Sequence, residues 1–153
     1  MKFIRLGGII TGFGLSGRVF VGELKIDEYD VIWKELDSVK YPRTKHLCFK
    51  LGNNVFIAGG YGDDGILSTV EKYNLKEQSW EVYPKPLPCK LTSASVAVDK
   101  DETYAVITGG LTSAHTDYRG LCDNHIIFTL EEVVFSKSSL QKRRSQCLAM
   151  RIS

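Results

Sequence analysis

A glycine-rich stretch near the start of the sequence carries the first pattern that could do chemistry. Residues 12–17 read Gly-Phe-Gly-Leu-Ser-Gly after an apolar run, which matches the Gly-x-Gly-x-x-Gly pattern of dinucleotide-binding loops. Such a loop binds a pyrophosphate where a helix follows, because amides of the first helical turn donate to the phosphate. Residues 18–26 are instead β-branched and partly alternating, so they predict a strand. We therefore interpret the glycines as part of a loop between strands.

The three histidines offer little for catalysis. His46 falls on an expected strand, where a structural role is the simpler interpretation, and His125 stands apart from it. His115 has Ser113 and Asp117 nearby in the chain. A Ser-His-Asp triad is assembled by the fold from separate segments, so such a local group is more typical of a polar loop. The sequence predicts no catalytic residues.

The four cysteines are widely spread along the chain. They form no Cys-x-x-Cys pair and have no paired histidines, and zinc sites draw their ligands in close pairs. We predict no metal and no cofactor. There is also no Asn-x-Ser/Thr sequon, so we expect reduced thiols and a cytoplasmic location. The cysteines are Cys48, Cys89, Cys122 and Cys147.

Composition excludes several classes of partner. The chain has 153 residues, 43% of them hydrophobic and 25% charged, which is ordinary for a globular domain. A net charge of +2 is too small to favour nucleic acid, and no apolar run reaches the roughly 18 residues of a membrane-spanning helix. Residues 1–10 could alternatively be a short secretory signal, but their glycine pair is in phase with two later pairs.

The elements behind these residues are organised by a repeat. Three apolar runs each end on two adjacent glycines, and these endings recur about every 50 residues. Glycine at a strand end tolerates positive φ and lets a neighbouring backbone approach closely. The pairs are Gly7 and Gly8, Gly59 and Gly60, and Gly109 and Gly110.

The middle copy shows the plan of one repeat unit. Strands are expected over residues 43–51, 55–60, 68–74 and 78–83, separated by turn signals. Four antiparallel strands in about 40 residues are typical of one propeller blade. The third copy repeats this plan, with strands over 91–98, 104–110, 126–129 and 133–136.

Aromatic residues add a second periodic signal. Trp80 stands seven residues after Tyr73, and Trp33 takes the place of Trp80 in the first copy. Phe128 and Phe135 have the same spacing as Tyr73 and Trp80, so we align them as aromatic substitutes. This combination of doubled glycine, tyrosine and tryptophan resembles the kelch repeat. The residues that carry the signature are Gly7, Gly8, Trp33, Gly59, Gly60, Tyr73, Trp80, Gly109, Gly110, Phe128 and Phe135.

The resemblance implies an all-β fold of kelch-type propeller blades, each with four antiparallel strands named A to D from the inside outward. About three blades are expected in one domain, 1–153, as an incomplete ring with repeats near 1–51, 52–98 and 99–153. The chain would start on a B strand, and residues 144–152 would be an A strand of a further blade. The basic run 142–144 would connect blades, although a localisation signal is an alternative. The open edges predict either a part of a longer ring, which we favour, or self-association of two three-blade halves.

The resemblance also implies a function. B–C loops and D–A connections emerge on one face, where a rigid scaffold presents variable polar residues to a protein or peptide partner. Many kelch proteins are substrate-recognition subunits of ubiquitin ligases, usually with a BTB domain that these residues lack, and others bind actin. The alternative is a propeller enzyme acting on a sugar or small metabolite. The expected contact residues are Arg18, Arg43, Tyr61, Asp63, Asp64, Thr112, His115, Asp117, Tyr118 and Arg119.

Overall fold

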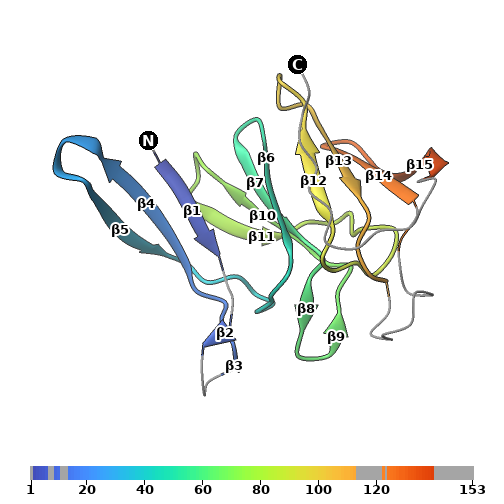
Figure 1. Ribbon diagram of the computed structural model, residues 1–153, viewed down its shortest axis with the longest axis horizontal. Coiled ribbons are helices and arrows are strands. Elements are labelled where there is room, and N and C mark those ends of the chain that lie inside the picture. Colours follow the sequence, from blue (N-terminus) through green and yellow to red (C-terminus); the bar gives the residue numbers. More distant parts are fainter. Residues whose placement is uncertain (1, 7–8, 11–13, 113–121, 123, 140–153) are drawn as a thin grey trace.

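The described residues form three larger antiparallel sheets and two two-stranded hairpins, as the computed structural model shows (Figure 1). The structure describes residues 2–6, 9–10, 14–112, 122 and 124–139. Within them the only helix is the single 3₁₀ turn η1 (Ile26–Glu28), and no described helix is long and apolar enough to cross a membrane. The all-β prediction is confirmed.

Among the residues that the structure describes, blade 1 has three paired strands. β1 (Lys2–Leu6), β4 (Val19–Lys25) and β5 (Asp30–Leu36) pair in the order β1-β4-β5. β1 pairs with β4 as β7 pairs with β10, so β1 takes the place of strand B, as predicted. The 3₁₀ turn η1 joins strands C and D, and Tyr29 after it takes a left-handed conformation with φ of 51°.

Blades 2 and 3 have the full four strands. Blade 2 follows the order β6-β7-β10-β11, and blade 3 follows β12-β13-β14-β15. In both blades each strand pairs with the next one along the chain, which is the predicted A to D plan. The strands are β6 (Leu47–Leu51), β7 (Asn54–Ala58), β10 (Val70–Asn74) and β11 (Ser79–Val82) in blade 2, and β12 (Ser95–Val98), β13 (Tyr104–Thr108), β14 (Asn124–Thr129) and β15 (Val133–Ser139) in blade 3.

The described glycine pairs have the positive φ and the close backbone neighbours that their position at the strand ends predicts. Gly59 and Gly60 have φ of 62° and 97°, and Gly109 and Gly110 have φ of 68° and 96°. A Cβ on Gly60 would lie 2.8 Å from the carbonyl oxygen of Thr44, which is too close. These positions therefore need glycine both for backbone conformation and for close approach. Gly7 and Gly8 lie outside the described residues.

Aromatic rings hold blade 2 against blade 3. Phe128 of blade 3 lies 5.0 Å from both Phe49 and Phe56 of blade 2, and 5.8 Å from Tyr83, measured between ring centroids. Phe128 and Phe56 are fully buried. Edge-to-face and offset stacking of this kind stabilises beyond the buried area alone. This interface forms the main core of the protein.

The contact between blades 1 and 2 is smaller. Val19, Val39 and Ile57 form its buried centre, and Trp80 packs on them half-buried. Blade 1 stands away from the rest of the molecule in Figure 1. A groove at this junction is lined by Ile4, Val21, Lys34, Leu36, Tyr73, Leu75 and Gln78.

Strand register corrects one predicted alignment. Trp80 lies directly opposite Tyr73, and Trp33 lies opposite Gly22, so the two tryptophans are equivalent as predicted. In blade 3, however, Val133 lies opposite Phe128. Phe135 is therefore not the counterpart of Trp80. Fewer residues separate strands C and D of blade 3, so counting seven residues from Phe128 passes the equivalent position.

Candidate partner-binding face

Two small hairpins rise from the B–C loops. β8 (Tyr61–Gly62) pairs with β9 (Gly65–Ile66), and β2 (Ile9–Ile10) pairs with β3 (Gly14–Leu15). Figure 1 shows both hairpins at the lower edge of the molecule, beyond the ends of the B strands. Their shared position places these two B–C connections on one face, as predicted. The sequence predicted loops at both positions and did not predict these hairpins.

The β8–β9 hairpin presents a polar tip. Asp63 and Asp64 occupy its two-residue turn and are both exposed, and Tyr61 is 42% exposed at its base. Gly65 follows with φ of 102°, which suits a tight hairpin turn. The flanking pattern Gly-Asp-Asp-Gly was the signal in the sequence for this hairpin. The tip therefore presents two exposed carboxylates.

Arg18 lies directly before β4, the central strand of blade 1. Its guanidinium makes a bidentate ion pair with Glu35, with Nε–Oε1 of 2.8 Å and Nη2–Oε2 of 2.9 Å. It also lies 4.9 Å from the ring centroid of Phe20. The hydrogen bonds from Arg18 lower the pKa of Glu35. Both side chains are exposed, so Arg18 is held in place yet accessible.

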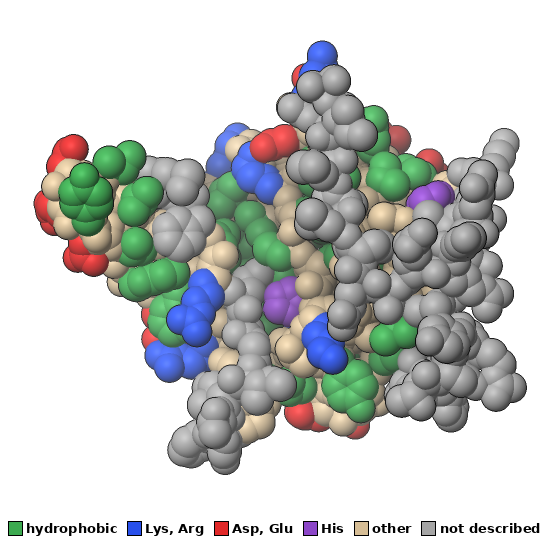
Figure 2. All heavy atoms as spheres, viewed as in Figure 1, with side chains coloured by type: hydrophobic (Ala, Val, Ile, Leu, Met, Phe, Trp, Pro, Cys, Tyr) green, Lys and Arg blue, Asp and Glu red, His purple; other side chains and the backbone are tan. Residues whose placement is uncertain are grey.

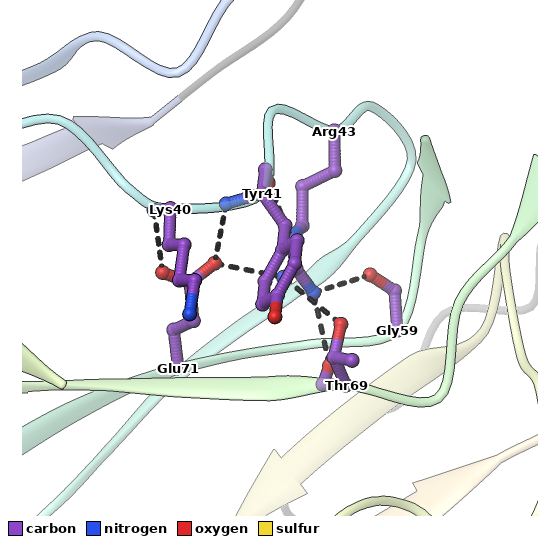
Figure 3. A network of polar contacts seen from close by, with 6 residues as sticks. All are labelled: Lys40, Tyr41, Arg43, Gly59, Thr69 and Glu71. Atoms are coloured by element: carbon purple, nitrogen blue, oxygen red, sulfur yellow. Dashed lines mark hydrogen bonds and ion pairs between the residues drawn. The ribbon is translucent and has the colours of Figure 1, made fainter. Parts of the chain in front are cut away.

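Arg43 is not a surface residue, and its predicted role in partner contact is wrong. Its side chain is 1% exposed and lies between the D–A crossover and strands β7 and β10 (Figure 3). Nη1 donates to the carbonyl oxygens of Gly59 and Thr69, each at 2.9 Å, and Nη2 donates to Glu71 Oε1 at 2.8 Å. Nε donates to the carbonyl oxygen of Tyr41 at 3.0 Å. Through these bonds Arg43 holds the D–A crossover against the ends of strands β7 and β10, so its role is structural.

Glu71 completes this network from the opposite side. Its Oε2 accepts from the backbone N–H of Lys40 at 2.7 Å, and its Oε1 accepts from that of Tyr41 at 3.2 Å. Like Arg43, its side chain is 1% exposed. Burial lowers the pKa of Arg43, and the carboxylate of Glu71 opposes that change. The crossover from blade 1 to blade 2 is thereby fixed to the base of the β8–β9 hairpin.

The crossover from blade 2 to blade 3 makes the same kind of backbone bridge, with apolar side chains at the positions of the ion pair. Thr44 bridges to Tyr61 after the second glycine pair, and Thr92 bridges to Leu111 after the third. Leu91 therefore stands where Arg43 stands. Ile126, two residues before Phe128, stands where Glu71 stands relative to Tyr73. The side chains of Leu91 and Ile126 are each 1% exposed and lie in the main core.

The other predicted contact residues are only partly described. Thr112 is half-buried, at the start of the third B–C loop. His115, Asp117, Tyr118 and Arg119 lie outside the described residues. Across the described part of the chain, no three histidine, cysteine or acidic side chains form a group able to hold a metal ion.

His46 lies directly before strand β6. It is half-buried, and burial, with a further effect from the positive charge of Arg43, lowers its pKa. Its Nδ1 has no hydrogen-bond partner among the residues that the structure describes. His46 is therefore neutral in the folded protein near neutral pH.

Comparison with known proteins places these features in a wider group. A family profile described as the Kelch motif matches residues 42–87. Kelch-like protein terF of Aspergillus terreus is 31% identical over 88 residues, covering 54% of this chain and 18% of terF. Kelch domain-containing protein 10 of Homo sapiens is 29% identical over 105 residues, covering 62% of this chain and 24% of the human protein.

The solved structures give the same picture for the fold. The structure of YjhT superposes with a TM-score of 0.73 at 15% sequence identity. The match covers 94% of this chain and 50% of YjhT. The chain thus spans half of that structure, and a quarter or less of the length of the two curated relatives.

Proposed function

We propose that this chain binds a protein partner through the face formed by its B–C hairpins and D–A crossovers, because residues 42–87 match the Kelch motif and the chain is similar to kelch proteins over about half of its length. The proposal is of a binding module rather than an enzyme. It rests on one observation above all, the exposed β8–β9 hairpin standing on a rigid, buried base.

The base of the hairpin is held by backbone and side-chain bonds. The N–H of Thr44 donates to the carbonyl oxygen of Tyr61 at 3.0 Å, and the N–H of Tyr61 donates back at 2.8 Å. Beneath them Arg43 ties the crossover to Gly59. A loop that is already ordered loses little conformational entropy on binding, so its contacts contribute more fully to affinity.

The chemistry of the tip suggests the kind of partner. Asp63 and Asp64 offer acceptors to lysine or arginine, and Tyr61 beside them offers a ring for apolar or cationic contact. A peptide segment or loop with basic side chains fits this arrangement. Tyrosine is also enriched where binding energy is concentrated in interfaces.

A peptide selection tests the proposal. Random peptides displayed on phage are selected against the immobilised chain, and affinities are measured for the chain with Asp63→Asn and Asp64→Asn and for Tyr61→Ala. We expect selected peptides to carry lysine or arginine and to bind these variants at least tenfold more weakly. The matched control is Asp101→Asn, an exposed acidic residue in the A–B turn at the opposite end of the strands. Peptides that bind the hairpin variants as tightly as the unchanged chain would rule the proposal out.

Two more specific functions rest on the family resemblance alone. One is substrate recognition within a ubiquitin ligase adaptor, and another is binding to actin. Co-sedimentation with filamentous actin separates the second from the first, since only an actin binder pellets with the filaments. The enzyme alternative predicts stabilisation by a sugar or small metabolite in a thermal-shift screen.

A further inference from the structure

Two cysteine side chains meet beside the crossover from blade 2 to blade 3. Cys89 lies in the crossover and is half-buried, and it packs against the main core. Cys122 belongs to that core and is only 5% exposed. A side-chain hydrogen bond joins the two thiols, and both cysteines are free in this structure. The pair therefore consists of one thiol that solvent can reach and one that lies behind it.

Backbone contacts bring the two cysteines together. The N–H of Cys122 donates to the carbonyl oxygen of Gly110 at 2.9 Å. Gly110 in turn lies directly against Leu91, since a Cβ built on this glycine would come within 2.9 Å of Leu91 Cδ1. Leu91 stands two residues after Cys89. The closeness of the thiols thus follows from the path of the backbone and not from the side chains alone.

The crossover is fixed on both sides of Cys89. The N–H groups of Leu87 and Leu91 donate to carbonyl oxygens of residues 68 and 67 at 2.9 and 3.0 Å. Pro88, directly before Cys89, restricts the backbone further. Two groups that are already held close lose little entropy when a bond forms between them, so this arrangement favours a reaction between the thiols.

The equivalent positions of blade 2 carry other side chains. The N–H of Leu67 donates to the second glycine of its pair at 2.9 Å, as the N–H of Cys122 does, so these two residues are equivalent. Counted back from the bridging threonine of each crossover, Tyr41 takes the place of Cys89. The repeat can therefore be built without thiols at these positions, and blade 3 has a chemical group that blade 2 lacks.

We propose that Cys89 and Cys122 are a reversible oxidation site, at which hydrogen peroxide converts the two thiols into an intramolecular disulfide. The sulfur of Cys89 attacks one peroxide oxygen, the O–O bond breaks, and water leaves with the thiol proton, which gives a sulfenic acid. The sulfur of Cys122 then attacks the sulfenic sulfur, the S–O bond breaks, and its thiol proton leaves in a second water. Two thiols and one peroxide thus give one disulfide and two waters.

The surroundings of Cys89 make the first step slow. The hydrogen bond with Cys122 and burial raise the pKa of Cys89, so little of this thiol is in the reactive thiolate form at neutral pH. The pair therefore stays reduced until the exposure to peroxide is prolonged. Once the sulfenic acid forms, the sulfurs need only move from hydrogen-bond contact to the S–S bond length of about 2.05 Å, which is within reach of a side-chain rotation.

The disulfide would join two segments of the candidate partner-binding face. Cys89 belongs to the D–A crossover, and the hydrogen bond from Cys122 to the glycine pair closes the third B–C connection as that of Leu67 closes the second. Figure 2 shows acidic side chains at the lower edge of the molecule, where the β8–β9 hairpin of this face lies. A bond that closes the loop 89–122 restricts the unfolded chain, so the oxidised protein should melt about 5–10 °C higher. This consequence needs no partner.

Peptide mapping after oxidation tests the site. The chain is treated with millimolar hydrogen peroxide, remaining thiols are blocked with N-ethylmaleimide, and trypsin digestion is followed by mass spectrometry without reduction. The four cysteines lie in four different tryptic peptides, with Cys89 in 77–90 and Cys122 in 120–137. We expect these two peptides linked, two hydrogens lighter than their sum, in a protein that still runs as a single chain on a non-reducing gel. Dithiothreitol should separate them and reverse the rise in melting temperature.

Three variants complete the experiment. Cys89→Ser and Cys122→Leu, which copies blade 2, should each abolish the linked peptide and the rise in melting temperature. Cys48→Ser is the matched control, since Cys48 lies on β6 outside this pair, and it should keep both. Circular dichroism checks that each variant is folded. Peptides that stay unlinked after prolonged peroxide, a disulfide that joins two chains or other cysteines, or a linked protein with an unchanged melting temperature would each overturn the proposal.

Discussion

Arg43 and Glu71 form a fully buried ion pair with Nη2–Oε1 of 2.8 Å, and blade 3 replaces the pair with Leu91 and Ile126. The same crossover geometry is thus stabilised by charge in one blade and by apolar packing in the next. A buried ion pair is often no more stable than well-packed apolar residues of similar volume. Removing one partner alone, however, leaves a charge buried without compensation.

Substituting one or both members of this pair separates those two effects. Arg43→Leu alone should lower the free energy of unfolding by about 3–5 kcal/mol, because Glu71 loses its partner. Arg43→Leu combined with Glu71→Ile copies blade 3 and should recover most of that loss. Urea denaturation followed by circular dichroism measures both. A double variant as unstable as the single one would show that the apolar solution of blade 3 does not transfer to blade 2.

Gly60 should be intolerant of a side chain. Gly60→Ala should lower the free energy of unfolding by about 1–3 kcal/mol, because its φ of 97° is strained for alanine and a Cβ would lie 2.8 Å from the carbonyl oxygen of Thr44. Gly52→Ala is the control, since its φ is 54° and a Cβ there would meet open space. Equal losses for the two variants, in thermal or urea unfolding, would contradict the role of close approach at Gly60.

The corrected alignment in blade 3 makes a simple prediction. Phe128→Ala should cost about 3–5 kcal/mol of stability, since it removes a fully buried ring from the aromatic contact between blades 2 and 3. Phe135→Ala should cost much less, because Phe135 is 42% exposed and lies opposite Ile126 instead. Unfolding curves of the two variants check this. A larger effect at Phe135 would restore the original alignment.

The A–B turn of blade 3 should contribute to acid sensitivity. Asp99 Oδ1 accepts from the N–H of Tyr104 at 2.9 Å and of Thr103 at 2.6 Å, and these hydrogen bonds lower its pKa. Its folded pKa therefore lies below the unfolded value of about 3.9, so its contribution is complete above that value and is lost as pH falls through the folded pKa. Asp99→Asn should flatten the decrease in stability below pH 4. Asp101→Asn changes a carboxylate of the same turn that accepts neither hydrogen bond, and it should leave the decrease steep.

Most of the architecture was predictable because its signals are local. Doubled glycines mark strand ends, since no other residue tolerates their φ and the close approach of a neighbouring backbone. Alternation and turn residues mark the strands between them. The order of strands A to D in blades 2 and 3, the place of β1 as strand B and the face on which the two described B–C hairpins lie all follow from these signals.

Other features depended on residues far apart in the sequence. Arg43 looked like an exposed loop arginine, because its partners Gly59, Thr69 and Glu71 lie 16, 26 and 28 residues further along the chain. The alignment of Phe135 failed because the length of the C–D turn, rather than a constant spacing, sets the register. The sequence by itself determined the repeat and the strands of each blade, through local backbone preferences. Only the tertiary structure decided which side chains are buried between blades and which remain on the surface, because burial depends on packing between segments that the sequence keeps apart.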